Sequence, residues 1–389
     1  MAHGNFVSEW FGHRMYPAVV STPDSLSDQR RQRCPFLSAA TGQFTECIKS
    51  KPARGVCTIS SVSNGPRQDW VVCPYRAFDL QLMEDVARRL YETSDRLHLV
   101  PAPVLRASDR QAQVRKLLAA GERVLVYFDQ KMGGEIQVGA TERSPQIAFD
   151  TTFVELLADG DAVQMGRFAV LEIQTMDFHG SYRKAVENLE SALRLHLSDF
   201  PRQVQANPRW LSEKVEGPNI ANVFKRTFWQ MMFKFEMAAT PTCAGVALAI
   251  PASVWDSWQK FLAAPPLTAQ ADGTARLGRP HDAGAERLTS WIYVFDLDAA
   301  AQLTPSPMQV RTIIHTSAGA LAHYALEEAP KGAIVELQGG IYRALRRRLR
   351  EFWLVDVDIP AGAGQGSDAV QVAEDPRPVD QIVQANLEE

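Results

Sequence analysis

The middle of the chain contains four β-like segments in close succession, and this feature constrains the fold more than any other. Residues 123–130, 134–140, 145–153 and 166–176 are rich in β-branched and aromatic residues, and short connections separate them. We expect these segments to form a hairpin-rich sheet. In the last of them, VLEIQ places Glu172 and Gln174 two residues apart, on one face of a strand that is otherwise hydrophobic.

Segments with helical periodicity surround the predicted sheet. We expect helices at residues 79–92, 108–121, 181–197, 219–238 and 253–264, with two more near 317–329 and 339–353, and further buried strands at 243–251 and 290–298. Strands followed by helices and then by more strands predict a mixed sheet with helices on both faces. The expected fold class is therefore α/β (α+β).

Chain length and hydropathy limit the classes of protein to which this chain can belong. The chain has 389 residues and 46% hydrophobic residues, which suits one large globular domain with appendages. No apolar run approaches the roughly 20 residues that a membrane-spanning helix needs. The N-terminal residues lack the basic-then-apolar order of a signal peptide. We therefore expect a cytoplasmic protein without a membrane partner.

The charge is unevenly distributed along the chain. Residues 360–389 hold six acids and one arginine, a net of −5, so the remaining residues carry +1 of the total charge of −4. A near-neutral body can still bind DNA through a local basic patch, because the local field matters more than the total charge. The tail itself is rich in Gly, Pro and acids, and we expect it to be disordered.

Four of the five cysteines lie close together near the N-terminus: Cys34, Cys47, Cys57 and Cys73, with 12, 9 and 15 residues between them. Close cysteines in a reducing cytosol are more often metal ligands than disulfides. The spacing contains no C-x-x-C pair, so four unrelated buried thiols remain an equal alternative. Few large apolar residues surround these cysteines, and a segment so poor in core residues needs a cross-link, such as a bound metal, to stay folded.

These patterns divide the chain into four parts. We expect an N-terminal arm at 1–30, a small four-cysteine metal-binding domain at 31–78, a catalytic domain with helical decorations at 79–359, and the acidic tail at 360–389.

Several acids are predicted to meet at one edge of the sheet. Asp150 ends the segment QIAFD, Glu172 lies within a buried strand, and Glu135 begins the neighbouring segment GEIQV. Carboxylates this close repel one another, so the cluster makes sense only if a cation neutralises it. Oxygen ligands select a hard ion such as Mg²⁺. A single strand-end acid could be an ordinary exposed residue, but Glu172 inside VLEIQ could not.

A hard divalent cation held by carboxylates, in a chain without a phosphate-cradling Gly-rich loop, suits phosphodiester hydrolysis. An Asp at one strand end followed 22 residues later by an acid-x-polar pair resembles the PD-(D/E)xK nuclease superfamily. In that pattern a lysine normally stands at the position of Gln174, so this chain is an E-x-Q variant. An amide can orient water but supplies no charge, so a second metal near Glu135 is the simplest compensation.

The resemblance narrows to the NotI-type type II restriction endonucleases. It is carried by WFGHRMYPAVVST, CPFLSAA, VLEIQTMDFHGSY, EGPNIANVFKRTF and AIPASVWDSW, and it runs from about Asn5 to about Trp291. It implies a restriction-endonuclease-like core and Mg²⁺-dependent hydrolysis of double-stranded DNA at a GC-rich palindrome. It also implies a homodimer with one active site per strand, as a bacterial restriction system would use. The C-terminal third departs most, which leaves the recognition sequence open.

The resemblance also implies roles for individual residues. Asp150, Glu172 and Gln174 would form the catalytic site, with Asp150 and Glu172 as Mg²⁺ ligands and Glu135 as an accessory acid. The four cysteines would hold one structural iron ion. The residues themselves do not distinguish iron from zinc, and only the resemblance favours iron.

The base-reading residues are harder to assign. Guanine is read best by Arg or Lys and cytosine by Asp or Glu. Candidates are Arg67, Gln68 and Asp69 in the cysteine segment, and Arg183 and Lys184 after the predicted catalytic strand. For each of them alone, ordinary solvated surface is the stronger interpretation.

Two other functions fit part of the pattern. In the first, the chain is a DNA-binding module without catalysis that a bound metal stabilises, and Glu172 and Gln174 are structural. In the second, it is a four-cysteine DNA repair exonuclease with an iron–sulfur cluster. The uncharged Gln174 favours the first, and the absence of helicase or partner-docking signatures weighs against the second.

Overall fold

The computed structural model describes residues 4–352 except for 64, 161, 281–287 and 299–302. The chain divides into two compact units, Met1–His323 and Tyr324–Glu389. The predicted arm, cysteine segment and most of the predicted catalytic domain thus belong to the first unit. The predicted disordered tail at 360–389 lies outside the described residues.

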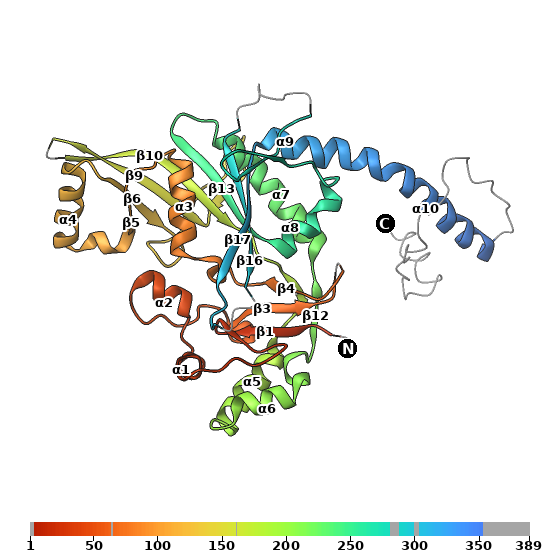
Figure 1. The fold of residues 1–389 in the computed structure, drawn as a ribbon. Helices are drawn as coiled ribbons and strands as arrows, with labels where there is room; N and C mark the ends of the chain where they lie inside the picture. The colour runs from red at the N-terminus through yellow and green to blue at the C-terminus, as the bar shows by residue number, and fades with distance from the viewer. Residues whose placement is uncertain (1–3, 64, 161, 281–287, 299–302, 353–389) are drawn as a thin grey trace. The chain divides into compact units, whose positions relative to one another are not determined.

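A large mixed sheet forms the centre of the first unit (Figure 1). Within the described residues it has nine strands in the order β14 (Thr268–Ala269), β15 (Ala275–Arg276), β17 (Met308–Thr316), β16 (Ser290–Leu297), β13 (Cys243–Pro251), β10 (Ala162–Ile173), β9 (Thr151–Asp159), β6 (Arg123–Phe128) and β5 (Leu97–Pro101). β10 pairs antiparallel with β9 and parallel with β13. The mixed sheet with flanking helices that the sequence predicts is therefore confirmed.

The C-terminal part of β10, Ala169–Ile173, is buried on both faces, which explains its nearly continuous hydrophobic run. Ala169, Leu171 and Ile173 pack in the same core cluster as residues of helix α3 (Leu80–Leu90). Successive side chains of a strand point to opposite faces, so Glu172 lies on the other face. Helix α7 (Ile220–Met237) covers Glu172 from that side.

The sequence of α7 explains how it packs. Its buried residues, which include Phe224, Phe228, Met231 and Phe235, recur every three or four positions and form one apolar stripe. Lys234 falls within the same stripe and is also buried.

The remaining helices of the first unit are α1 (Pro23–Arg31), α2 (Pro35–Thr41), α4 (Ser108–Ala119), α5 (Arg183–Leu195), α6 (Phe200–Ala206), α8 (Ala252–Trp258) and α9 (Ala318–His323). Thr22 caps α1, because its side chain accepts a hydrogen bond from the backbone N of Ser25. Strands β11 (Phe178–Gly180) and β12 (Val215–Pro218) form a small separate sheet that leads into α5 and α7. No helix among the described residues is long and apolar enough to cross a membrane.

A second sheet lies at the N-terminus. It has the order β2 (His13–Arg14), β1 (Phe6–Trp10), β3 (Val56–Ser61) and β4 (Gln68–Val71). β1 pairs antiparallel with β3, so the residues expected to form an arm are joined to the cysteine segment by backbone hydrogen bonds. The sequence analysis did not predict this sheet.

The segment 134–140 does not join the central sheet, and the expectation that it neighbours the strand of Glu172 is wrong. Its only strand, β7 (Ile136–Val138), pairs with β8 (Ile147–Phe149) in a separate hairpin. Gly133 and Gly134 have φ values of 97° and 93°, a conformation that turns the chain away from β6 and that favours glycine. Asp150 lies between β8 and β9.

The C-terminal unit begins in a continuous helical run. A π-helical turn, η6 (Tyr324–Glu328), follows α9 and leads directly into α10 (Ala329–Phe352), where the sequence analysis expected a gap between two helices. Pro330, which lacks a backbone N–H, lies two residues after the π-helical turn, so the proline and the change in helical hydrogen bonding fall together within this run.

Candidate functional site

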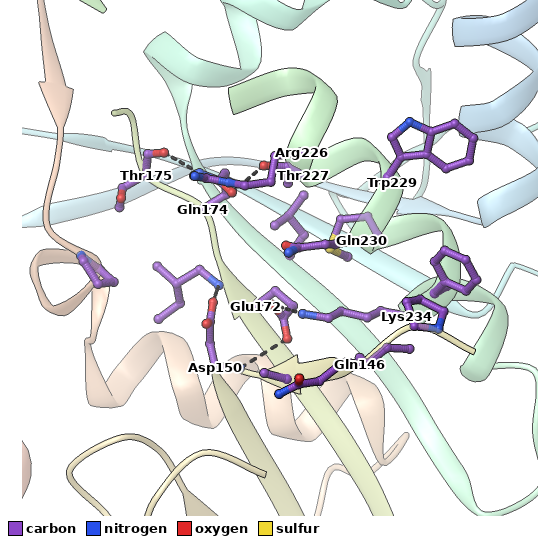
Figure 2. Close-up of a pocket in the computed structure, with 18 of the residues that line it drawn as sticks. Gln146, Asp150, Glu172, Gln174, Thr175, Arg226, Thr227, Trp229, Gln230 and Lys234 are labelled. Atoms are coloured by element: carbon purple, nitrogen blue, oxygen red, sulfur yellow. Dashed lines mark hydrogen bonds and ion pairs between the residues drawn. The ribbon is translucent and has the colours of Figure 1, made fainter. Parts of the chain in front are cut away.

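Asp150 and Glu172 meet where β9 begins beside the end of β10. The backbone N of Asp150 lies 3.3 Å from Glu172 Oε1, and Asp150 Oδ2 accepts a hydrogen bond of 2.9 Å from the backbone N of Ile173 (Figure 2). The antiparallel pairing of Thr151 with Leu171 sets this register. The sequence prediction that these two carboxylates lie together is thus matched by their positions.

Lys234 completes the cluster, and the sequence analysis did not identify it. Its ammonium reaches from α7 to within 2.5 Å of Glu172 Oε2, and both side chains are buried, with 4% and 8% of their surface exposed (Figure 2). The ammonium also lies 5.5 Å from the centre of the Phe149 ring. The available sequence signal was a lysine placed within the apolar stripe of an amphipathic helix.

The electrostatic balance of this cluster leaves Glu172 short of positive charge. Burial, followed by the negative charge of Asp150, raises the pKa of Glu172 to about 8. The charge and hydrogen bond of Lys234 lower the pKa but do not cancel those effects. At neutral pH the site therefore favours an additional proton or an additional cation.

Gln174 follows the end of β10, and both polar atoms of its side-chain amide form hydrogen bonds. Its carbonyl oxygen accepts a hydrogen bond from the hydroxyl of Thr227 on α7, and its amide nitrogen donates to the backbone oxygen of Thr175. Its own backbone N donates to Ala249 O on β13 at 3.0 Å. Gln174 therefore ties the end of β10 to α7, the helix that supplies Lys234.

Glu135 lies in the turn before β7, yet it still approaches the cluster. It lines a small cavity of about 60 Å³ together with Asp150 and Asp129, an acid at the end of β6 that the sequence analysis did not select. Burial, then the charge of Asp150, raises the pKa of Glu135. Burial also raises the pKa of Asp129, whose Oδ1 accepts hydrogen bonds from the backbone N of Lys131 and Met132.

A larger cavity of about 700 Å³ opens onto Asp150, Glu172 and Lys234. The exposed side of α7 lines it, with Trp229 62% and Phe233 45% exposed, and residues 145–148 of the β7–β8 hairpin also contribute to its lining. The volume lies within the range of about 300–1,000 Å³ that is typical of ligand sites. The buried cluster is thus accessible to a substrate.

The four N-terminal cysteines lie near one another. Cys34, Cys57 and Cys73 belong to one buried cluster, and the backbone N of Gly55 donates to Cys47 Sγ at 3.4 Å. A hydrogen bond between Cys57 and Cys73 raises the pKa of Cys57 and lowers the pKa of Cys73 to about 6. All of them are free thiols. Within the described residues no three His, Cys, Asp or Glu side chains stand in a metal-holding arrangement, so the metal stays a prediction.

The predicted base-reading residues have partners within the protein. Arg67 donates to Gly4 O and Ser60 O and lies over the rings of Phe6 and Tyr16. Asp69 forms an ion pair with Arg14, and Gln68 belongs to β4.

Arg183 and Lys184, on the first turn of α5, both pair with Glu187 at 2.8 Å. Their hydrogen bonds lower the pKa of this exposed carboxyl to about 2. Reading a base would require these side chains to exchange their present partners.

A scan against protein-family models and a search of curated proteins find no match for this chain.

Proposed function

We propose that this protein is a Mg²⁺-dependent type II endonuclease that hydrolyses double-stranded DNA at a GC-rich palindrome. The observation that carries the proposal is the cluster of Asp150, Glu172 and Lys234 at an accessible cavity. Two acids and a cation are the charged groups that the PD-(D/E)xK pattern requires. Here the cation comes from α7 and not from the strand position that Gln174 occupies.

Asp150 and Glu172 would hold the Mg²⁺ ion. Their oxygen atoms are the donors that this hard cation prefers, and the raised pKa of Glu172 marks a deficit of positive charge at the same place. When bound, the ion supplies Lewis-acid stabilisation of the phosphoryl group and lowers the pKa of the attacking water.

Lys234 would supply the positive charge that the amide of Gln174 lacks. A buried ammonium beside the carboxylates stabilises the negative charge that develops on the phosphoryl oxygens, and it fixes the orientation of Glu172. Gln174 is a positioning residue in this proposal, because both ends of its amide are engaged by Thr227 and Thr175. Glu135 remains the proposed accessory acid, now beside Asp129.

We further propose that the four cysteines bind one iron ion. Their mutual proximity and their free thiols support a four-sulfur donor set. Elemental analysis of the purified full-length protein should find one transition metal per chain, and Cys57→Ser should lose it. A metal-free protein that folds and binds DNA normally would refute this part.

We also propose a homodimer in the cytoplasm of a bacterium, because a palindrome presents the same surface to each half of a two-fold dimer. Helix α10 carries an apolar stripe that a second copy would cover. Its members recur every three or four residues and are each at least 40% exposed: Ile334, Leu337, Ile341, Leu345, Leu349 and Phe352.

Antiparallel pairing of two α10 helices aligns their apolar stripes. It brings Ile341 of one copy beside Leu345 of the other, near the midpoint of both helices. Two such stripes would bury on the order of 1,000 Å², close to the lower limit for specific interfaces. Sedimentation should show a dimer that Ile341→Lys with Leu345→Lys converts to a monomer. A monomeric native protein would contradict the pairing.

Cleavage of plasmid DNA tests the proposed activity. Purified protein is incubated with a GC-rich plasmid and Mg²⁺, and the ends are sequenced. A single palindromic cut site is expected. Specific binding without cleavage would instead indicate a non-catalytic DNA-binding module, and digestion only from DNA ends would indicate an exonuclease.

A further inference from the structure

A second cleft, of about 730 Å³, lies between the N-terminal region and helix α5. The N-terminal side consists of Trp10 and Phe11 at the end of β1, residues at the end of α1, and the short helix η1 (Lys51–Ala53) with Arg54. On the other side α5, which packs against η1, contributes Glu190 and Arg194. None of these residues belongs to the carboxylate site.

The cleft is strongly cationic. Four basic side chains line it (Arg30, Lys51, Arg54 and Arg194), and Glu190 is its one acidic lining residue among the described residues. In the part of the chain that the structure describes, none of the four basic residues forms an ion pair with a carboxylate. Arg183 and Lys184 on the same α5 helix are, by contrast, both paired with Glu187. Unpaired guanidinium and ammonium groups converging on one cleft are suited to phosphate.

The lining of the cleft also contains polar atoms without partners. Gln29 on α1 is only 3% exposed, and neither its amide oxygen nor its amide nitrogen has a hydrogen-bond partner in the described protein. The same holds for the buried Nε of Arg54, although Nη1 of Arg54 donates to Gln32 at 2.7 Å. Buried polar atoms are nearly always hydrogen-bonded, so an unpartnered donor–acceptor amide in the wall of a cleft points to a ligand.

The local backbone fixes the shape of this wall. Trp10 Nε1 donates to Arg54 O at 3.1 Å, and Phe11 N donates to Gly55 O at 2.6 Å. A Cβ at Gly55 would lie 2.6 Å from the Phe11 ring, so only glycine allows the chain after Arg54 to approach β1 this closely. The Arg54 side chain is therefore carried on a constrained backbone in the cleft that Gln29 also lines.

We propose that this cleft binds a nucleotide unit, with the phosphate held by Arg30, Arg54 and Arg194 and a base edge hydrogen-bonded by the Gln29 amide. A glutamine amide offers one donor and one acceptor side by side, which matches the edge of adenine. The cleft volume fits one such unit. The unit is either a free nucleotide or one residue of a polynucleotide strand, and only the second source depends on the proposed nuclease function.

Titration calorimetry of the full-length protein with inorganic phosphate, deoxyadenosine monophosphate and a short single-stranded oligonucleotide tests the proposal. The double variant Arg30→Gln/Arg194→Gln should weaken binding of deoxyadenosine monophosphate at least about tenfold. The control, Arg110→Gln/Lys116→Gln, removes two exposed cations from α4 and should change the affinity less than twofold. Equal losses in both variants would show general electrostatic attraction and would overturn the site.

Gln29→Leu separates recognition of the base from recognition of the phosphate. It should weaken binding of the nucleotide several-fold and leave inorganic phosphate unchanged, and circular dichroism confirms that the variant is folded. Unchanged nucleotide affinity would mean that the amide is merely hydrated and would overturn the role of Gln29. If only the oligonucleotide binds, and Glu172→Gln still binds it, the cleft is a site for a polynucleotide strand that is independent of catalysis. Failure of all three ligands to bind would refute the proposal.

Discussion

Two buried glutamates of this protein, Glu9 in the N-terminal sheet and Glu172 in the central sheet, each pair with a buried base, yet their surroundings differ. Glu9 accepts bonds from Arg76 at 2.8 and 3.1 Å and from the Thr58 hydroxyl at 2.5 Å. Glu172 accepts a bond from Lys234 at 2.5 Å and a long contact of 3.3 Å from Asp150 N. Glu9 is fully enclosed, whereas Glu172 lines an accessible cavity.

The pKa values of the two glutamates shift in opposite directions. Burial alone raises the pKa of Glu9, but the charge and hydrogen bonds of Arg76, with the charge of Arg14, bring it below the usual value. Burial and the charge of Asp150 raise the pKa of Glu172 to about 8 despite Lys234. The difference lies in the neighbouring charges, because Glu9 faces two guanidinium groups and Glu172 faces one ammonium and a second carboxylate.

The Glu9 pair is a structural ion pair, whereas the Glu172 cluster is a candidate active site. The Glu9 pair satisfies its own charges and needs nothing from solution. The Glu172 cluster carries one more acid than base and is open to a cavity, so it is suited to hold a cation near a substrate. Burial of an ion pair does not by itself indicate a functional site. A buried cluster with unequal numbers of acids and bases that opens to a cavity does.

The largest effect is expected for Glu172→Gln. The proposed cleavage of DNA should fall by about 10³-fold or more, as when a principal charged group of an active site is lost. The unfolding free energy should not decrease at neutral pH, because a carboxyl with a pKa of about 8 is mostly protonated there, so the amide replaces a neutral group. Plasmid cleavage rates and urea unfolding test both statements. Cleavage within tenfold of the native rate would remove Glu172 from the site.

Glu9→Gln should show the opposite pattern. Breaking this pair leaves Arg76 buried without its counter-charge, and we expect a loss of about 3–5 kcal/mol in unfolding free energy. Cleavage per folded molecule should be unchanged. Urea unfolding and active-site titration separate the two quantities. If Glu9→Gln costs less than Glu172→Gln in stability, the contrast between the pairs is wrong.

Lys234→Met should lower cleavage by about 10²-fold, the lower end of the effect of removing one group that stabilises the transition state. Adding Gln174→Lys to Lys234→Met returns an ammonium to the strand position usual in the superfamily pattern, and we expect it to restore about tenfold of that loss. Arg76→Met serves as the control, because it should reduce stability and not cleavage per folded molecule. If adding Gln174→Lys restores no cleavage and the Mg²⁺ dependence stays normal, Lys234 has a purely structural role.

The smallest effect is the pH dependence of stability without divalent cations. The native pKa of Glu172 lies above its usual 4.5, so the native state binds the proton more tightly, and stability falls as pH rises from about 4.5 to 8. We expect a fall on the order of 1–3 kcal/mol that is absent in Glu172→Gln. Glu9 acts oppositely, because its lowered pKa removes stability only as pH falls below 4.5. Urea unfolding from pH 3 to 8 in EDTA measures both slopes, and parallel curves for native protein and Glu172→Gln would contradict the shift.

Much of the central sheet was predictable from the sequence because its signals are local. The alternation in VLEIQ placed Glu172 and Gln174 on one face, and the hydrophobic runs located β13 and β16. Asp150 also met Glu172 as expected, since neighbouring antiparallel strands bring these positions together. These predictions needed only the two-residue period of strands and short connections.

Other features were not predictable because they depend on contacts between distant segments. Lys234 lies 62 residues from Glu172, and its helical period indicated only that it faces the interior. The segment with Glu135 turns away at Gly133 and Gly134 but returns its carboxyl to the cluster. The cationic cleft likewise combines Gln29, Arg54 and Arg194 from three separate segments.

The sequence by itself therefore determined that a buried strand of this protein carries an acid that requires a positive partner. Only the tertiary structure decided which residue supplies that charge and how much charge is still missing. The reason is physical: the period of a strand or helix sets the direction of a side chain, but the pKa of a buried carboxyl depends on every charge around it. For Glu172 those charges are Lys234 on helix α7 and Asp150 just before strand β9.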